Sequence, residues 1–328
     1  MMSAQESEAK DQRSAVRRRR FRAARFDWAS FLGTGATGLA TLLIIAILAI
    51  ILGNVVVNGL PQLTWRLVST GTASDMFDVL KAGIFPMIFG TTARVMLMTI
   101  FVLPAGVLTA IYLTEYARMN SPFTRVIRGA VNNLAGVPSI VFGLFGAGFF
   151  VRFIGKGIDS ALYPARAATV WGQPALLWAS ATLAVMTLPV VIVATEEALR
   201  AIPQGLREAS LALGATKLET IVKIVLPQAT PGIMTGAILA ISRAAGEVAP
   251  ILFTGAAYYM ADLPKSLHDQ FMDLGYHVFI LSTQSPNVDK TRPLLYATVL
   301  VLLCLTFLLN IVAIFVRANM RRKMRMLQ

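Results

Sequence analysis

Long apolar segments, separated by shorter polar ones, dominate this chain of 328 residues. A helix needs about 20 predominantly apolar residues to cross the hydrocarbon core of a membrane. Six segments meet that requirement, and we expect them to span near residues 34–57, 86–114, 132–153, 174–195, 231–256 and 293–316. The pattern therefore predicts an all-α membrane protein with six transmembrane helices.

The first of these spans differs from the other five. It is almost uniformly aliphatic and has no internal charge or proline, which is typical of a helix that faces lipid. It is also too long for the apolar region of a signal peptide. The later spans contain proline, glycine and polar residues, which are tolerated at membrane depth where protein or a water-filled cavity surrounds them. We therefore predict five core helices and one N-terminal peripheral helix.

Composition excludes a soluble domain, because 56% of the residues are hydrophobic and only 14% are charged. The formal net charge of +13 comes from basic residues that gather at the two ends and in particular loops. The positive-inside rule explains this distribution more economically than a nucleic-acid partner, and we expect no nucleic acid to bind. The single cysteine, Cys304, allows no intrachain disulfide and no cysteine-built metal site.

The basic residues also predict an orientation with both termini in the cytoplasm. The segments then expected in the cytoplasm are the basic tail 1–33, the loops 115–131 and 196–230, and the basic tail 317–328. The segments expected outside are the loop 58–85 and the less basic loops 154–173 and 257–292. Residues 34–57 form the peripheral helix, and residues 86–316 form the core.

The stretch from Pro203 to Pro227, which we call the elbow, predicts two short helices joined at a glycine. Pro203 suits the first turn of a helix and Gly214 suits the left-handed residue that closes it. Thr216 and Glu219 have the spacing of a capping box for the second helix. Apolar residues then recur at helical spacing, and we expect Pro227 to end the helix.

The elbow resembles the coupling loop of type I ABC importer permeases, whose pattern is Glu-Ala-Ala, three residues, Gly, nine residues and Ile-x-Leu-Pro. The matching positions are Glu208, Ala209, Ser210, Gly214, Ile224, Leu226 and Pro227, with Ser210 as the one departure. In that family the loop inserts into a groove of a separate ATPase subunit. The alternative is an amphipathic elbow on the inner membrane surface, which would not need these residues at fixed offsets.

The fifth span carries the residues expected to contact a substrate. Small residues recur every four positions, at Gly232, Gly236, Ala240 and Ala244, and predict close approach of another helix. Arg243 and Glu247 stand one turn apart near the predicted middle, where a charge costs roughly 2.5–3.5 kcal/mol and needs a partner. Either the two residues only pair with each other, or Arg243 offers its guanidinium to an anion while Glu247 holds it.

We expect less direct roles for the other polar residues of the chain. The rise per residue places Arg94 at about the level of Arg243, so Arg94 is a further path candidate, unless it snorkels outward. Asn132, Asn133 and Ser139 are expected to satisfy backbone groups freed by Pro138. The two histidines, His268 and His277, are expected on the surface of an outer loop.

No segment of the sequence has the Walker A pattern that cradles nucleotide phosphates. The nearest approach is Gly155-Lys156, where Phe150 occupies the first glycine position and Gly157 follows the lysine. We therefore expect a transport subunit that is not an enzyme and has no cofactor of its own, with ATP and Mg on a partner ATPase.

Longer stretches resemble the second permease subunits (PstA type) of phosphate-specific ABC importers. The matching segments are 85–117, 132–146, 195–216 and 226–257, and Val248 stands where the family usually has threonine. The resemblance implies the MetI-like permease fold of type I importers, in the inner membrane of a bacterial cell. It also implies a heterodimer with a second related permease, two ATP-binding subunits and an extracytoplasmic phosphate-binding protein.

The implied mechanism is alternating access driven by ATP hydrolysis, with Arg243, Glu247 and Arg94 lining the path. A permease for another oxyanion, such as molybdate or sulfate, would have the same topology. An ATP-independent secondary transporter or channel, gated by the Arg–Glu pair, would not need the elbow motif. A membrane-embedded enzyme would need a cluster of histidines or carboxylates at one face, and neither histidine lies in a predicted span.

Overall fold

The computed structural model describes residues 28–72, 77, 81–118, 121–164 and 168–325. Within these residues the chain forms helices and loops, with an isolated bridge between Ala256 and Phe271. The helices before the elbow are α2 (Trp28–Gly59), η1 (Leu60–Gln62), α3 (Trp65–Ser69), α4 (Phe85–Ile111), η2 (Tyr112–Tyr116), α5 (Pro122–Ala135), α6 (Ser139–Gly146), η3 (Ala147–Gly155), α7 (Lys156–Leu162) and α8 (Leu176–Arg200). Those that follow are α9 (Gln204–Ala212), α10 (Lys217–Thr220), η4 (Ile221–Val225), α11 (Leu226–Gly246), α12 (Ile251–Thr254), α13 (Leu274–Thr283) and α14 (Val288–Arg325).

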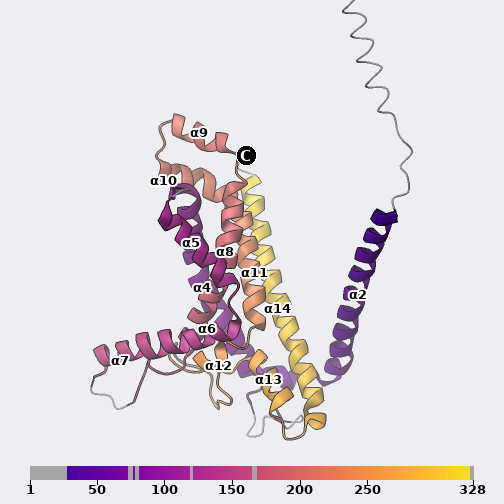
Figure 1. Ribbon diagram of the computed structural model, residues 1–328. Coiled ribbons are helices and arrows are strands. Elements are labelled where there is room, and N and C mark those ends of the chain that lie inside the picture. The colour runs from indigo at the N-terminus through magenta and orange to yellow at the C-terminus, as the bar shows by residue number, and fades with distance from the viewer. Residues whose placement is uncertain (1–27, 73–76, 78–80, 119–120, 165–167, 326–328) are drawn as a thin grey trace, which may run out of the picture. The chain divides into compact units, whose positions relative to one another are not determined.

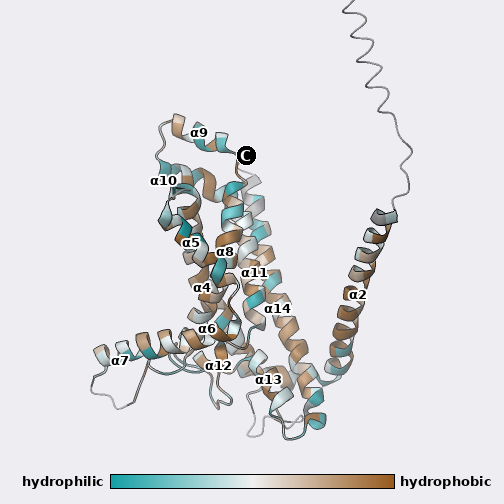
Figure 2. Ribbon diagram, viewed as in Figure 1, coloured by the Kyte–Doolittle hydropathy of each residue, from teal (hydrophilic) through white to brown (hydrophobic). Residues whose placement is uncertain are grey.

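Six stretches of the described chain are long and apolar enough to cross a membrane, which confirms the predicted number of spans. The chain divides into two units after Asn54, and the described part of the first unit is most of α2. Figure 2 shows α2 coloured as hydrophobic along most of its length, and only 6% of its most apolar window is buried. These features agree with a peripheral helix. The structure begins this helix at Trp28, six residues before the predicted start, and the rest of the basic tail lies outside the described residues.

The second unit, Val55–Gln328, is built around α8, and 67% of the most apolar window of this helix is buried. Helices α4 and α11 pack along α8, and α14 packs on α11 (Figure 1). Hydroxyl groups inside α8 donate to carbonyls four residues back, as Thr182 does to Trp178 and Thr187 to Leu183. These bonds satisfy the two hydroxyls within the helix, so this part of α8 can be buried in apolar surroundings.

The small-residue ridge of the fifth span packs on α8 as predicted. A Cβ atom built on Gly232 would lie 2.3 Å from Ala198 Cβ, and one built on Gly236 would lie 2.8 Å from Ala194 Cβ. No larger residue fits these two positions without movement of α8. Close backbone approach, rather than interlocking of large side chains, therefore joins α11 to α8.

The predicted third span, 132–153, is not one helix. Asn132 and Asn133 belong to α5, and the segment from Gly136 to Pro138 separates α5 from α6. The residue before a proline is disfavoured in the α conformation, which accounts for the break. Figure 1 shows α5 running along the bundle, whereas α6 and α7 run across its lower end.

The two ends of this unit carry different elements (Figure 1). Helices α9 and α10 lie at one end, together with the last turns of α14, while α12 and α13 lie at the other. Helix α14 continues to Arg325, nine residues beyond the predicted end of the sixth span, so the basic residues from Arg317 to Arg325 extend it as helix.

Candidate functional site

The elbow has the two-helix structure that its sequence predicts. Helix α9 ends with Gly214 at φ +86°, where the N–H of Gly214 donates to Leu211 O at 3.0 Å and the N–H of Ala215 donates to Ser210 O at 3.2 Å. This pair of bonds is a Schellman motif. A capping box then starts α10, because the Glu219 N–H donates to Thr216 Oγ1 and the Thr216 N–H donates to Glu219 Oε2.

Pro227 does not end the second elbow helix, contrary to the prediction. Helix α10 passes through the π-helical turn η4 into α11, and the N–H of Leu226 donates to Ile221 O five residues back. A proline ring in an α-helix clashes with the carbonyl four residues earlier. The wider π turn directly before Pro227 changes the local register, so the helix continues without a stop.

The coupling-motif residues occupy both faces of the elbow. Glu208 and Ala209 are exposed on α9, whereas Ile224, Leu226 and Pro227 are half-buried where η4 joins α11. Ser210, the departure from the motif, lies 2.9 Å from Thr220 through the two hydroxyl oxygens. The serine thus joins α9 to α10 by a hydrogen bond that alanine would not make.

A row of apolar side chains on the elbow faces away from the bundle. Ile221 and Val225 are buried against it, but Leu218 and Val222 on the same helix are exposed. Leu213, at the tip between the two helices, is 89% exposed. The remaining exposed apolar residues of the elbow are Leu206 and Leu211. Five exposed apolar residues on so short a segment are unusual for a surface that meets only water.

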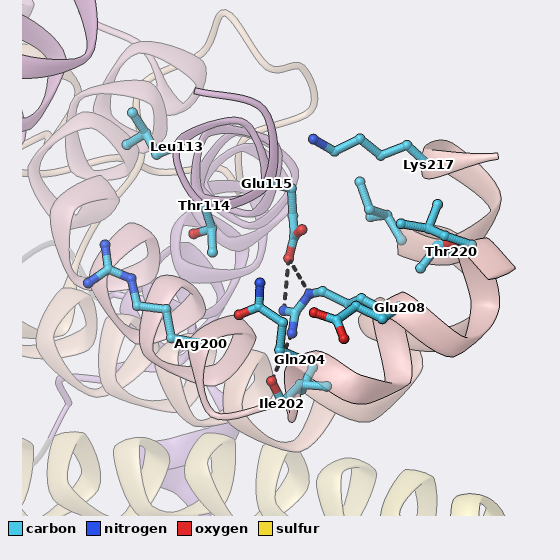
Figure 3. Close-up of a pocket in the computed structure, with 12 residues that line it drawn as sticks. Leu113, Thr114, Glu115, Arg200, Ile202, Gln204, Glu208, Lys217 and Thr220 are labelled. Atoms are coloured by element: carbon cyan, nitrogen blue, oxygen red, sulfur yellow. Dashed lines mark hydrogen bonds and ion pairs between the residues drawn. The ribbon is translucent and has the colours of Figure 1, made fainter. Parts of the chain in front are cut away.

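A cleft of about 680 Å³ lies between the elbow and the end of α4. Figure 3 shows Glu115, Glu208 and Lys217 lining this cleft, with dashed lines on Glu115 that mark its pairing with Arg207. Beside the cleft, Glu196 pairs with Arg128 at 2.8 Å and with Arg200 at 3.0 Å. Charged side chains of both signs therefore fix the surroundings of the elbow.

Arg243 and Glu247 lie together at the opposite end of α11. Arg243 Nε is 3.5 Å from Glu247 Oε1, so the pair that the sequence predicts is formed. The prediction placed both residues near the middle of one helix, 231–256, but α11 ends at Gly246 and Glu247 has extended backbone angles. The chain resumes as α12 only after Pro250. Arg243 is 42% exposed at its side chain, which leaves it accessible to a ligand.

Arg94 lies at the level of Arg243, as predicted, but it is fully buried in other bonds. Its guanidinium donates to Ala244 O at 2.8 Å and to Ala245 O at 3.4 Å, in the last turn of α11. It also pairs with Asp273 at 2.8 Å, and Thr91 Oγ1 donates to the same carboxylate. Arg94 thus holds α4, α11 and the start of α13 together and does not snorkel outward.

For some residues the structure differs from the prediction, or shows a role that the sequence analysis did not predict. Asp273, the partner of Arg94, also accepts from the Tyr276 N–H as the N-cap of α13, and an Asp before an apolar run is the signal that could have identified it. His277 was expected on the surface, but it is buried, and neither ring nitrogen has a hydrogen-bond partner among the described residues. Val248 packs on Gly275, where a Cβ would lie 2.8 Å from Val248 Cγ2.

A family model described as "Binding-protein-dependent transport system inner membrane component" matches residues 102–326. The chain belongs to this family. The permease is 34% identical to the "Probable ABC transporter permease protein YqgI" of Bacillus subtilis (strain 168), over 68% of this chain and 69% of that protein. It is 32% identical to "Phosphate transport system permease protein PstA 1" of Mycobacterium tuberculosis (strain ATCC 25618 / H37Rv), over 74% and 72%. The match to PstA of Mycobacterium leprae (strain TN) is 41% identical over 54% and 52%.

Solved structures support the same fold. A chain of a bacterial ABC transporter involved in alginate import aligns with a TM-score of 0.60 at 15% identity, covering 88% of the permease and 98% of that chain. A chain of the MetNI methionine ABC transporter aligns with a TM-score of 0.51 at 20% identity, covering 76% and 99%. The predicted fold, a MetI-like type I ABC importer permease with six transmembrane helices, is thus confirmed. The permease is a multi-pass membrane protein.

Proposed function

We propose that this permease is a membrane-spanning subunit of an ABC transporter that imports inorganic phosphate, driven by ATP hydrolysis on a separate subunit. The observation that carries the proposal is the set of relatives named phosphate transport system permease PstA, two of which are described above. The exposed apolar elbow and the accessible Arg243 supply the docking surface and the anion contact that such a subunit needs.

The partners follow from this assignment. The elbow, through Glu208 to Pro227, docks on one of two ATP-binding subunits, which hold ATP and Mg. A second, related permease completes the path, and an extracytoplasmic phosphate-binding protein delivers the anion. Both termini and the elbow then face the cytoplasm of the bacterial cell, where ATP is available.

Within the path, Arg243 presents a guanidinium whose donors match two phosphate oxygens. Glu247 holds that guanidinium when no anion is bound, since the two side chains pair at 3.5 Å. Phosphate thus replaces Glu247 as the partner of Arg243. Because Glu247 competes for the guanidinium, phosphate is bound weakly and is released again.

The test is ATP-dependent uptake of radiolabelled phosphate by vesicles that contain the complete transporter. We expect Arg243→Gln to assemble and to lose uptake, and Gly214→Asp to lose ATPase docking or coupling because φ is +86° at that position. Gly205→Asp is a matched control, because Gly205 lies in α9 with no heavy atom within 4 Å of an added Cβ.

Each outcome of this test is informative. Uptake that survives Arg243→Gln would make the Arg–Glu pair structural and move the anion path elsewhere. ATP-dependent uptake of labelled sulfate or molybdate, without uptake of phosphate, would assign another oxyanion. Uptake that needs no ATP would overturn the ABC mechanism itself.

A further inference from the structure

The end of α4 is joined to the elbow only by non-covalent contacts. The elbow is continuous in sequence with α8 before it and with α11 after it. Glu115, on η2 at the end of α4, is 92 residues away in sequence from Arg207 on α9. Movement of the elbow therefore reaches α8 and α11 through the backbone, but it reaches α4 only through side chains.

Arg207 joins the elbow to the end of α4 by an ion pair with Glu115. Its Nε and Nη2 atoms donate to Glu115 Oε1 at 3.2 and 2.9 Å. The same guanidinium donates to Ile202 O and to Leu199 O, each at 2.8 Å. The side chains of the pair are only 17% and 10% exposed, so water screens them less than an exposed pair. Bonds to Glu115 and to two backbone carbonyls therefore hold the guanidinium of Arg207 in one orientation.

The second elbow helix contacts the same turn of η2. Lys217 Nζ lies 4.8 Å from the centre of the Tyr116 ring, next to Glu115 in the sequence. Arg128 of α5 donates to Leu113 O in this turn as well. By contrast, Glu196 of α8 pairs with Arg128 of α5 and with Arg200 of its own helix, and neither pair involves an elbow helix.

Helix α4 is fixed to the last turn of α11 at Arg94, nine residues after it begins at Phe85. Arg94 binds the carbonyls of Ala244 and Ala245 there, directly beside Arg243. The helical path from Arg94 to Glu115 is roughly 32 Å long at 1.5 Å per residue. Helix α4 thus connects the elbow with the place where Arg243 and Glu247 meet.

We propose that the Arg207–Glu115 pair is a strap that makes α4 follow the elbow, so that elbow movement reaches the Arg243–Glu247 pair through α4. The two residues are positioning residues and do not contact the transported anion. The inference rests on the proposed function. It predicts that loss of the strap lowers the amount of anion moved per ATP while ATP hydrolysis continues.

The test measures phosphate uptake and ATP hydrolysis in the same vesicles with the complete transporter. We expect Glu115→Ala and Arg207→Ala each to lower uptake per ATP by about fivefold or more. The double variant is expected to lose no more than either single one, because both remove the same contact. Glu115→Asp, which keeps the charge, is expected to recover part of the ratio. Arg200→Ala, which breaks a neighbouring ion pair within α8 and lies outside the elbow, is the matched control and is expected to leave the ratio unchanged.

An unchanged ratio in assembled Glu115→Ala, or an equal loss in Arg200→Ala, would overturn the strap. If Glu115→Ala does not assemble, Glu115→Gln keeps the shape of the side chain, and a wild-type ratio in that variant would overturn it equally. Absence of ATP-driven phosphate uptake in the wild type is a different result, since it contradicts the proposed function and not the strap.

Discussion

Arg94 shows what a buried charge requires in this permease. Its guanidinium has a carboxylate partner in Asp273 and two carbonyl partners at the end of α11. A cation is also favourable at the C-terminus of a helix, where carbonyl groups point outward. With these bonds made, Arg94 stabilises the position of α11 and is not free to bind an anion.

We therefore expect Arg94→Gln and Asp273→Asn each to destabilise the permease by about 3–5 kcal/mol, because each leaves a buried charge without its partner. Replacing both residues together, by Arg94→Met with Asp273→Leu, should cost less than the sum of the two single changes. Thermal unfolding of the purified transporter in detergent measures these effects. A single variant with a wild-type unfolding midpoint and a raised KM for phosphate would instead place Arg94 in the path.

His277 gives the permease a dependence on pH. Burial lowers the pKa of His277 to about 4, because the apolar surroundings disfavour the imidazolium, and α13 lies outside the six candidate spans. The unfolded chain, with an ordinary histidine pKa near 6.5, binds more protons between these two values. Stability is therefore full above about pH 6.5 and falls as the pH is lowered toward 4.

The measurement compares unfolding midpoints of the wild type and His277→Leu between pH 7.5 and 5. At pH 5 the buried histidine is expected to cost the wild type about 2 kcal/mol relative to pH 7.5, while the variant lacks this component. Only the difference between the two proteins is informative, since carboxylates also titrate in this range. Equal pH dependence of the two midpoints would contradict the prediction.

Residues whose roles depend on near neighbours were predictable from the sequence. Gly214, Thr216 and Glu219 act within a few positions of their partners, so their spacing alone indicated the caps. The partners of Arg94 and Arg207 lie far away in the sequence, and no local pattern pairs Asp273 with Arg94 or Glu115 with Arg207. The burial of His277 depends in the same way on helices that pack around α13.

At the scale of elements, the sequence predicted close approach of another helix to α11, and the structure shows that this helix is α8. The recurrence of small residues predicted the contact surface of α11, and the structure places Ala194 and Ala198 against it. Helix ends were predicted less well. Pro227 lies inside a helix, whereas Pro138 and the segment 247–250 interrupt helices. The effect of a proline depends on the turn before it, which composition does not reveal.

The contact at Gly232 can be tested by exchanging sizes across it. Gly232→Ala places a methyl group 2.3 Å from Ala198 Cβ, and we expect a loss of about 1–3 kcal/mol in stability. Ala198→Gly in the same chain removes the opposing methyl group and should restore most of the loss. Gly205→Ala, in a helix with open space around it, is the control and should not destabilise. Failure of the second change to rescue the first would show that the helices do not meet at this point.

At the scale of the whole molecule, the number of spans and their apolar character were predictable. Each helix that crosses the membrane needs a long, predominantly apolar segment, which is visible in the sequence. The arrangement inside the second unit was not predictable, since α5, α6 and α7 form a broken segment whose parts run in different directions (Figure 1). The elbow and the last turns of α14 share one end of this unit, and the loop before α13 lies at the other. Basic residues on α14, including Arg317 and Arg322, predict that the elbow end faces the cytoplasm.

Cysteine labelling tests this orientation in a chain whose single cysteine is removed by Cys304→Ala. Ser266 is exposed near α13, and Arg322 is exposed near the end of α14. We expect a membrane-impermeant maleimide to label Ser266→Cys in intact cells, and to label Arg322→Cys only after the membrane is opened. The reverse pattern would place the elbow outside, where no ATPase could reach it with ATP, and would contradict both the orientation and the proposed drive. Labelling of both positions in intact cells would show that the two ends of the second unit do not lie on opposite sides of a sealed membrane.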